Sequence, residues 1–363
     1  MDLPVLEELP DLRSLPCLKS LRIRMMSMLK HIDFAFSGAT EKVLLPRVET
    51  LVLRDLEALE ELPSNLGRLP CLKLLNIANI STVKQIGHEF FSTEAISKCF
   101  LSLENLVISD MPACEGWCWI DDSDLFPSLQ RLVIYGCPKL EWLPPLPPSL
   151  TYLTLEEVGL TELPSLWELE INESGGNQTT SSLLNLRISK CNNLISLEEG
   201  LLSQNLSNIE HIYVAGCNEL MRMSLKRFEN FTSLKELQIK ACPKLSLIQE
   251  EETALLPPSL KTLKLDDSGD LDKLLLGNLY NLTSLTKLEI VKCPPRTISS
   301  KRTFSPLELL TITDCHELRL VEGLEASRSL WELVIRRCPN LSSNPVEQGG
   351  KSFLRQLRSY EIV

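Results

Sequence analysis

The sequence predicts a solenoid of the α/β repeat class, mostly β and irregular, with a concave parallel β-sheet and a convex face of loops and short 3₁₀ or helical turns. One observation is the motif LKELQIKACPKL at residues 234–245, in which Leu234, Leu237 and Ile239 are followed by Cys242. Apolar residues at spacings of three and then two suit a short strand with alternate side chains directed inward, and they do not maintain a helical stripe.

The other observation is the recurrence of this motif. It begins fifteen times, at Leu18, Val48, Leu72, Leu103, Leu129, Leu150, Leu166, Leu183, Ile209, Leu234, Leu260, Leu285, Leu307, Leu330 and Leu357. Most intervals lie within or just outside the roughly 20 to 29 residues of leucine-rich repeats. We therefore expect one leucine-rich-repeat domain over 1–363, a horseshoe of about 14–15 repeats. Spacing is irregular around 150–183, where three motif starts could represent two coils or three.

The outer segments of the predicted coils lack helical patterning. Pro63, Gly67 and Pro70 interrupt the segment that precedes the motif at Leu72, so we expect irregular backbone there. The long coils at 18–47 and 72–102 carry insertions, including 85–91, which we expect on the outside or rim. Residues 172–182 contain no apolar side chain and predict a mobile loop. An imperfect last coil over 342–363 is predicted to contribute Tyr360 and Ile362 to a strand.

Cysteines occupy a fixed place in the motif. Seven of the 12 lie eight residues after the first apolar residue of their repeat: Cys137, Cys191, Cys217, Cys242, Cys293, Cys315 and Cys338. A small, weakly polar side chain suits the inner turn after the strand, so we expect reduced structural thiols. Cys114 and Cys118 have the spacing of a metal-ligand pair but lack further ligands, and no metal site is predicted.

Composition restricts the class of partner. A formal charge of −11 argues against general binding to nucleic acid, which needs a basic face. No run of 18 apolar residues occurs and the first residues are acidic, so we expect neither a membrane span nor an export signal. The expected location is the cytoplasm, with the nucleus possible. None of the four His belongs to an HExxH pair and there is no Gly-x-Ser-x-Gly turn, so we expect no enzyme activity and no cofactor.

Residues between the core positions of each predicted strand should point out of the concave side. Aromatic and Arg side chains there are favoured as interface anchors, and charged ones could orient a partner. Acidic residues dominate the coils at 150 and 166, whereas bases slightly outnumber acids farther on. The predicted partner-binding residues are Tyr135, Tyr152, Glu156, Trp167, Glu168, Glu170, Arg187, His211, Tyr213, Lys240, Lys264, Trp331 and Arg336.

Three segments carry a family resemblance: LPCLKLLNI at 69–77, LVISDMPACEGW at 106–117 and FPSLQRLVIYGCPKL at 126–140. They resemble the leucine-rich-repeat region of plant intracellular disease-resistance proteins of the coiled-coil, nucleotide-binding type. The resemblance implies a recognition and autoinhibitory role. The implied partners are a pathogen effector or modified host protein and, if the chain is a fragment, the nucleotide-binding domain of the same receptor. Gly350, Lys351 and Ser352 imitate the end of a phosphate loop, but Pro345 replaces its first Gly. A ubiquitin-ligase substrate adaptor and an extracellular receptor ectodomain remain alternatives.

Overall fold

A computed structural model describes residues 9, 15–32, 45–92, 98–118, 125–164, 181–197, 206–224, 228–248, 256–269, 279–299, 306–324, 327–342 and 357–363. The chain forms two compact units, Met1–Leu183 and Leu184–Val363, which we describe separately. The predicted loop at 172–182 lies almost wholly outside the described residues.

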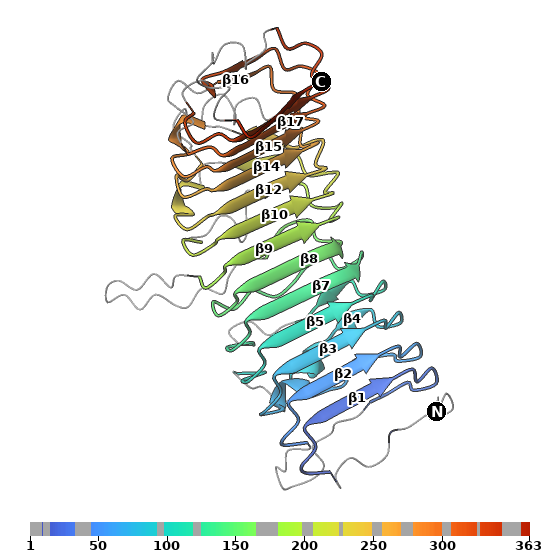
Figure 1. The fold of residues 1–363 in the computed structure, drawn as a ribbon. Helices are drawn as coiled ribbons and strands as arrows, with labels where there is room; N and C mark the ends of the chain where they lie inside the picture. Colours follow the sequence, from blue (N-terminus) through green and yellow to red (C-terminus); the bar gives the residue numbers. More distant parts are fainter. Residues whose placement is uncertain are drawn as a thin grey trace. The chain divides into compact units, whose positions relative to one another are not determined.

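The first unit is a stack of parallel strands in chain order (Figure 1). Its strands are β1 (Ser20–Arg24), β2 (Thr50–Arg54), β3 (Leu74–Ala78), β5 (Asn105–Ser109), β7 (Arg131–Cys137) and β8 (Tyr152–Val158). A second, smaller parallel pair joins β4 (Gln85–Ile86) to β6 (Gly116–Trp117). The described segments between strands include the 3₁₀ turn η2 (Leu66–Arg68) and the short helix α1 (His88–Phe91).

The second unit repeats this arrangement. Its strands are β9 (Asn185–Ser189), β10 (His211–Ala215), β12 (Glu236–Lys240), β14 (Thr262–Asp266), β15 (Lys287–Val291), β17 (Leu309–Thr313), β19 (Glu332–Arg336) and β20 (Ser359–Ile362). Two smaller parallel pairs join β11 (Arg222–Ser224) to β13 (Ser246–Ile248) and β16 (Thr297–Ser299) to β18 (Leu320–Glu322). The described part of this unit includes the 3₁₀ turns η4 (Phe228–Asn230) and η5 (Leu279–Asn281).

The predicted solenoid class is confirmed. Fourteen of the fifteen motif starts precede a strand of the main ladders, and the remaining one, Leu166, lies outside the described residues. Leu132, Leu237 and Leu288 are 3%, 0% and 0% exposed, and each pairs in register with an apolar residue of the next strand. The small parallel pairs β4–β6, β11–β13 and β16–β18 were not predicted. They lie in segments that carry Pro, Gly or charged residues and show no clear alternation.

A residue in the left-handed conformation directly follows most strands of the main ladders, and in β7 and β8 it is the last residue but one. At this position in thirteen strands φ lies between 48° and 64°; the residues are Met25, Asp55, Asn79, Asp110, Gly136, Glu157, Lys190, Gly216, Ala241, Asp267, Lys292, Asp314 and Arg337. In the second unit, for example, the amide of Gly216 donates to the carbonyl of Lys240 at 2.8 Å, and that of Ala241 donates to Asp266 at 2.7 Å. The turn thus extends the hydrogen-bond ladder by one residue, although most L-residues disfavour this conformation.

The turn cysteines occupy the predicted place. Each of the seven thiols donates to the carbonyl two residues earlier, at 3.2–3.6 Å. Ser268 takes the same position in its coil and donates to Asp266 at 2.9 Å. Burial raises the pKa of Cys137 and of Cys293 to about 11. The thiols of Cys137 and Cys293 therefore stay protonated and act as donors inside their turns, and all 12 cysteines are free.

Candidate partner-binding faces

The outward face of the first unit consists of the strand residues that alternate with the core. Its middle row contains Val52, Val107 and Val133, which stand in register on β2, β5 and β7. Tyr135 and Tyr152, on β7 and β8, are 40% and 43% exposed. The Arg131 guanidinium lies 5.9 Å from the centre of the Tyr152 ring. This face therefore combines three valines of its middle row with exposed aromatic rings and an arginine that lies over one of them.

Two polar atoms of the same face lack partners among the described residues. Asn76 Oδ1 and Ser109 Oγ are buried without a hydrogen bond. They belong to β3 and β5, at positions that alternate with the core. Glu156, on β8, is half-buried. An unpaired buried polar atom costs free energy in the isolated chain. The polar atoms at these two positions therefore have fewer hydrogen bonds than they would have on a solvated surface.

The outward face of the second unit carries charges that are paired with each other. His211 Nδ1 lies 3.3 Å from a carboxylate oxygen of Glu236, and Lys264 Nζ lies 3.8 Å from the other. Lys240 Nζ lies 3.2 Å from the carboxylate of Asp266. The charged groups come from neighbouring strands. The predicted residues His211, Lys240 and Lys264 therefore lie on one face. The two lysines already form ion pairs with acidic residues of neighbouring strands, so their charges are partly compensated within the chain.

Arg187 and Tyr213 form a cation–π contact across two neighbouring strands of this face. The Arg187 guanidinium lies 4.1 Å from the centre of the Tyr213 ring, and the two residues pair in register on β9 and β10. At the edge of the face, a hydrogen bond between Lys235 and Glu210 lowers the pKa of the Glu210 carboxyl. Arg187 is exposed and Tyr213 is half-buried, which leaves the guanidinium accessible while the ring fixes its position.

The remaining predicted residues lie near the end of the second unit or outside the described residues. Arg336 pairs with Glu361 of β20. Trp331 lies one residue before β19 and is half-buried, with the Arg358 guanidinium 6.0 Å from its ring. It is therefore at the margin of the face. Trp167, Glu168 and Glu170 lie outside the described residues.

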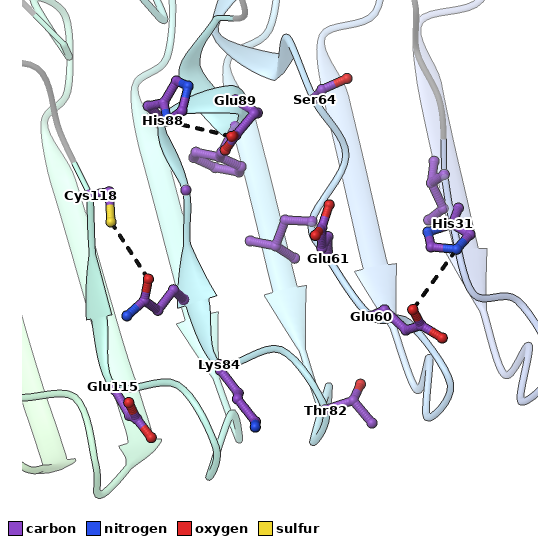
Figure 2. A pocket seen from close by; sticks show the side chains of 15 residues that line it. His31, Glu60, Glu61, Ser64, Thr82, Lys84, His88, Glu89, Glu115 and Cys118 are labelled. Carbon is purple, nitrogen blue, oxygen red and sulfur yellow. Dashed lines mark hydrogen bonds and ion pairs between the residues drawn. The ribbon is translucent and has the colours of Figure 1, made fainter.

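A groove of about 810 Å³ lies on a flank of the first unit, away from the predicted residues. Figure 2 shows that its lining comes from four successive coils: His31 follows β1, Glu60 and Glu61 follow β2, Lys84 to Glu89 follow β3, and Glu115 and Cys118 follow β5. The predicted insertion at 85–91 forms β4 and α1 here. This insertion was predicted to lie on the outside, and the groove was not predicted.

Within the described residues, no three His, Cys, Asp or Glu side chains gather closely enough to hold a metal ion. The same part of the chain contains no helix with the length and apolarity needed to cross a membrane.

Comparison with known proteins shows similarity to plant disease-resistance proteins. No family model matches the chain. An Arabidopsis thaliana protein named "Putative disease resistance RPP13-like protein 1" is 30% identical over 213 residues, which are 56% of this chain and 19% of that protein. The chain resembles the repeat region of plant disease-resistance proteins. A second Arabidopsis protein with a disease-resistance name is 36% identical over 98 residues, 26% of this chain and 7% of its own length.

Similarity also extends to leucine-rich-repeat proteins outside plants. The human volume-regulated anion channel subunit LRRC8B is 32% identical over 122 residues, 33% of this chain and 14% of that protein. A solved leucine-rich-repeat protein of Leptospira interrogans aligns over 98% of this chain and 93% of its own, at 16% identity and a TM-score of 0.36. The chain spans about a fifth of the length of the first curated relative, 19%. The predicted resemblance to the repeat region of disease-resistance proteins is thus confirmed at the level of that region.

Proposed function

We propose that the chain is the protein-recognition and autoinhibitory leucine-rich-repeat region of a plant immune receptor, which senses a pathogen effector or a host protein altered by one. The observation that carries this proposal is the outward face of the first unit, where Tyr135 and Tyr152 are exposed and the Arg131 guanidinium lies over the Tyr152 ring. Tyr and Arg are the side chains most often found as energetic anchors of protein interfaces. Similarity to disease-resistance proteins supports the biological context.

In the proposed mechanism, the outward face has two competing occupants. One is the nucleotide-binding domain of the same receptor, which holds it inactive, and the other is the effector or altered host protein. A ligand shifts such an equilibrium only by its difference in affinity for the two states. The region itself acts by binding and catalyses no reaction, and it works in the cytoplasm or nucleus.

Photocrosslinking tests this proposal in plant cells. A p-benzoylphenylalanine residue replaces Tyr135 or Tyr152, and in a control chain it replaces Glu162, which is exposed and outside the strands. We expect both face positions to crosslink one and the same protein, a nucleotide-binding domain or a defence-related protein, with no such adduct from position 162. Adducts that form equally from all three positions, or from none, would contradict recognition through this face.

A further inference from the structure

The flank groove of the first unit lies beside a stretch where two neighbouring coils share few hydrogen bonds among the described residues. The coil after β2 and the coil after β3 are joined at one end by the Thr82 hydroxyl, which donates to the Leu59 carbonyl, and at the other by the amide of Asn65, which donates to Glu89 at 2.7 Å. Between these two bonds, no backbone hydrogen bond of the described residues joins 60–64 to 83–88. These two segments therefore share no backbone hydrogen bond along this part of the groove.

Strand β4 consequently has one paired and one open edge. Towards β6, the carbonyls of Lys84 and Ile86 accept from the amides of Glu115 and Cys118 at 2.7 and 2.8 Å. Because successive residues of a strand direct their peptide groups to opposite edges, the N–H and C=O of Gln85 face the groove. Gln85 is exposed. An open strand edge is a template for pairing with another extended chain.

The groove is acidic above an apolar floor. Glu60, Glu61, Glu89 and Glu115 line it together with a single lysine, Lys84 (Figure 2). Among the described residues, Glu61 and Glu115 form no ion pair. Glu60 and Glu89 have only exposed neighbours at 3.4–4.0 Å, namely Lys30, His31 and His88. The floor consists of Ile32, Leu62 and Phe90, which are 6%, 8% and 1% exposed. Its charge favours a cationic occupant with some apolar side chains.

We propose that this groove binds an extended basic segment of a partner protein, added as a strand at the open edge of β4. The segment's peptide groups pair with Gln85. Its alternate side chains place Lys or Arg against Glu61 and Glu115 and apolar residues against the floor. The site shares no residue with the outward face, so the first unit can hold a second partner while that face is occupied.

A peptide probe tests the proposal on the full chain by fluorescence anisotropy. The probe is fluorescein-labelled Lys-Val-Arg-Val-Lys-Val-amide, and its matched control has N-methyl groups on alternate amides, which removes strand pairing while keeping the charge. We expect the first peptide to bind, with affinity falling as salt rises, and the N-methylated peptide to bind at least about tenfold more weakly. Hydrogen–deuterium exchange at the Gln85 amide should slow on binding.

Charge variants complete the test. The variant Glu61→Lys/Glu115→Lys should lower the affinity about tenfold or more, because it replaces two attractive contacts by repulsive ones. Glu162→Lys/Glu317→Lys makes the same change in net charge at exposed positions outside the groove and should shift the affinity less than about twofold. No binding of the first peptide, equal binding of its N-methylated form, or equal losses in the two charge variants would each overturn the proposal. The N-methyl comparison uses the unmodified protein and does not depend on the folding of any variant.

Discussion

The left-handed turn predicts opposite effects of two matched substitutions. Gly216 and Ala241 occupy the same position in neighbouring coils, with φ of 64° and 48°. Each amide donates to the next strand, at 2.8 and 2.7 Å. A left-handed conformation costs an L-residue roughly 1–2 kcal/mol, whereas glycine loses about 0.4–1 kcal/mol more than alanine in chain entropy on folding. The difference favours glycine by about 0.5–1 kcal/mol.

Ala241→Gly should therefore stabilise the protein and Gly216→Ala should destabilise it. The atom nearest to a Cβ added at Gly216 would be Lys190 Cγ, at the ordinary contact distance of 3.4 Å, so backbone conformation dominates the cost. Urea unfolding followed by circular dichroism should show midpoints displaced in opposite directions by roughly 0.2 to 1 M, for slopes of about 1–3 kcal/mol/M. If Ala241→Gly lowers the midpoint, the left-handed geometry assigned to this turn is wrong.

Three further predictions concern the interior and its thiols. Leu237→Ala, at a site 0% exposed, should lower the free energy of urea unfolding by about 2–5 kcal/mol; a loss under about 1 kcal/mol would contradict its burial. In native protein a thiol reagent should modify the exposed Cys17 and Cys118 first, and protection of both would refute their exposure. The raised pKa values of Cys137 and Cys293, about 11, exceed the usual 9.0, so the folded state retains protons that the unfolded chain releases. The free energy of unfolding should then fall between about pH 9 and 11, by up to about 1.4 kcal/mol for each pH unit and each thiol. The variant Cys137→Ala/Cys293→Ala should show a smaller fall over this range. An unchanged dependence on pH would contradict the raised pKa values of these two thiols.

Much of the architecture could be predicted because it depends on repetition. The spacing that places Leu237 and Ile239 on one side of a strand recurs in every coil, and it determines both the strand and its buried face. The place of Cys242 could be predicted for the same reason. The left-handed turn could not, because Met25, Lys190 and Arg337 have no preference for positive φ; the hydrogen-bond ladder imposes the conformation on them.

The candidate sites were less predictable. Tyr135, Tyr152 and Arg187 could be placed on outward faces by alternation alone. Sequence did not reveal that Lys240 and Lys264 have acidic neighbours on adjacent strands, because pairing across strands depends on register and rotamer. The flank groove could not be predicted at all, since the sequence does not show which neighbouring coils share few hydrogen bonds. The insertion at 85–91 was its only signal in the sequence.

The central claim is that core positions hold the coils together while outward positions are free to bind a protein. The most direct test uses the partner protein that crosslinks through position 135 or 152. The affinity of this partner is measured for the purified Tyr135→Ala/Tyr152→Ala chain and for the parent chain. We predict that the double variant binds this partner at least about tenfold more weakly, in keeping with the loss of two anchor side chains, although its urea unfolding midpoint matches that of the parent chain. An unchanged affinity would contradict the account.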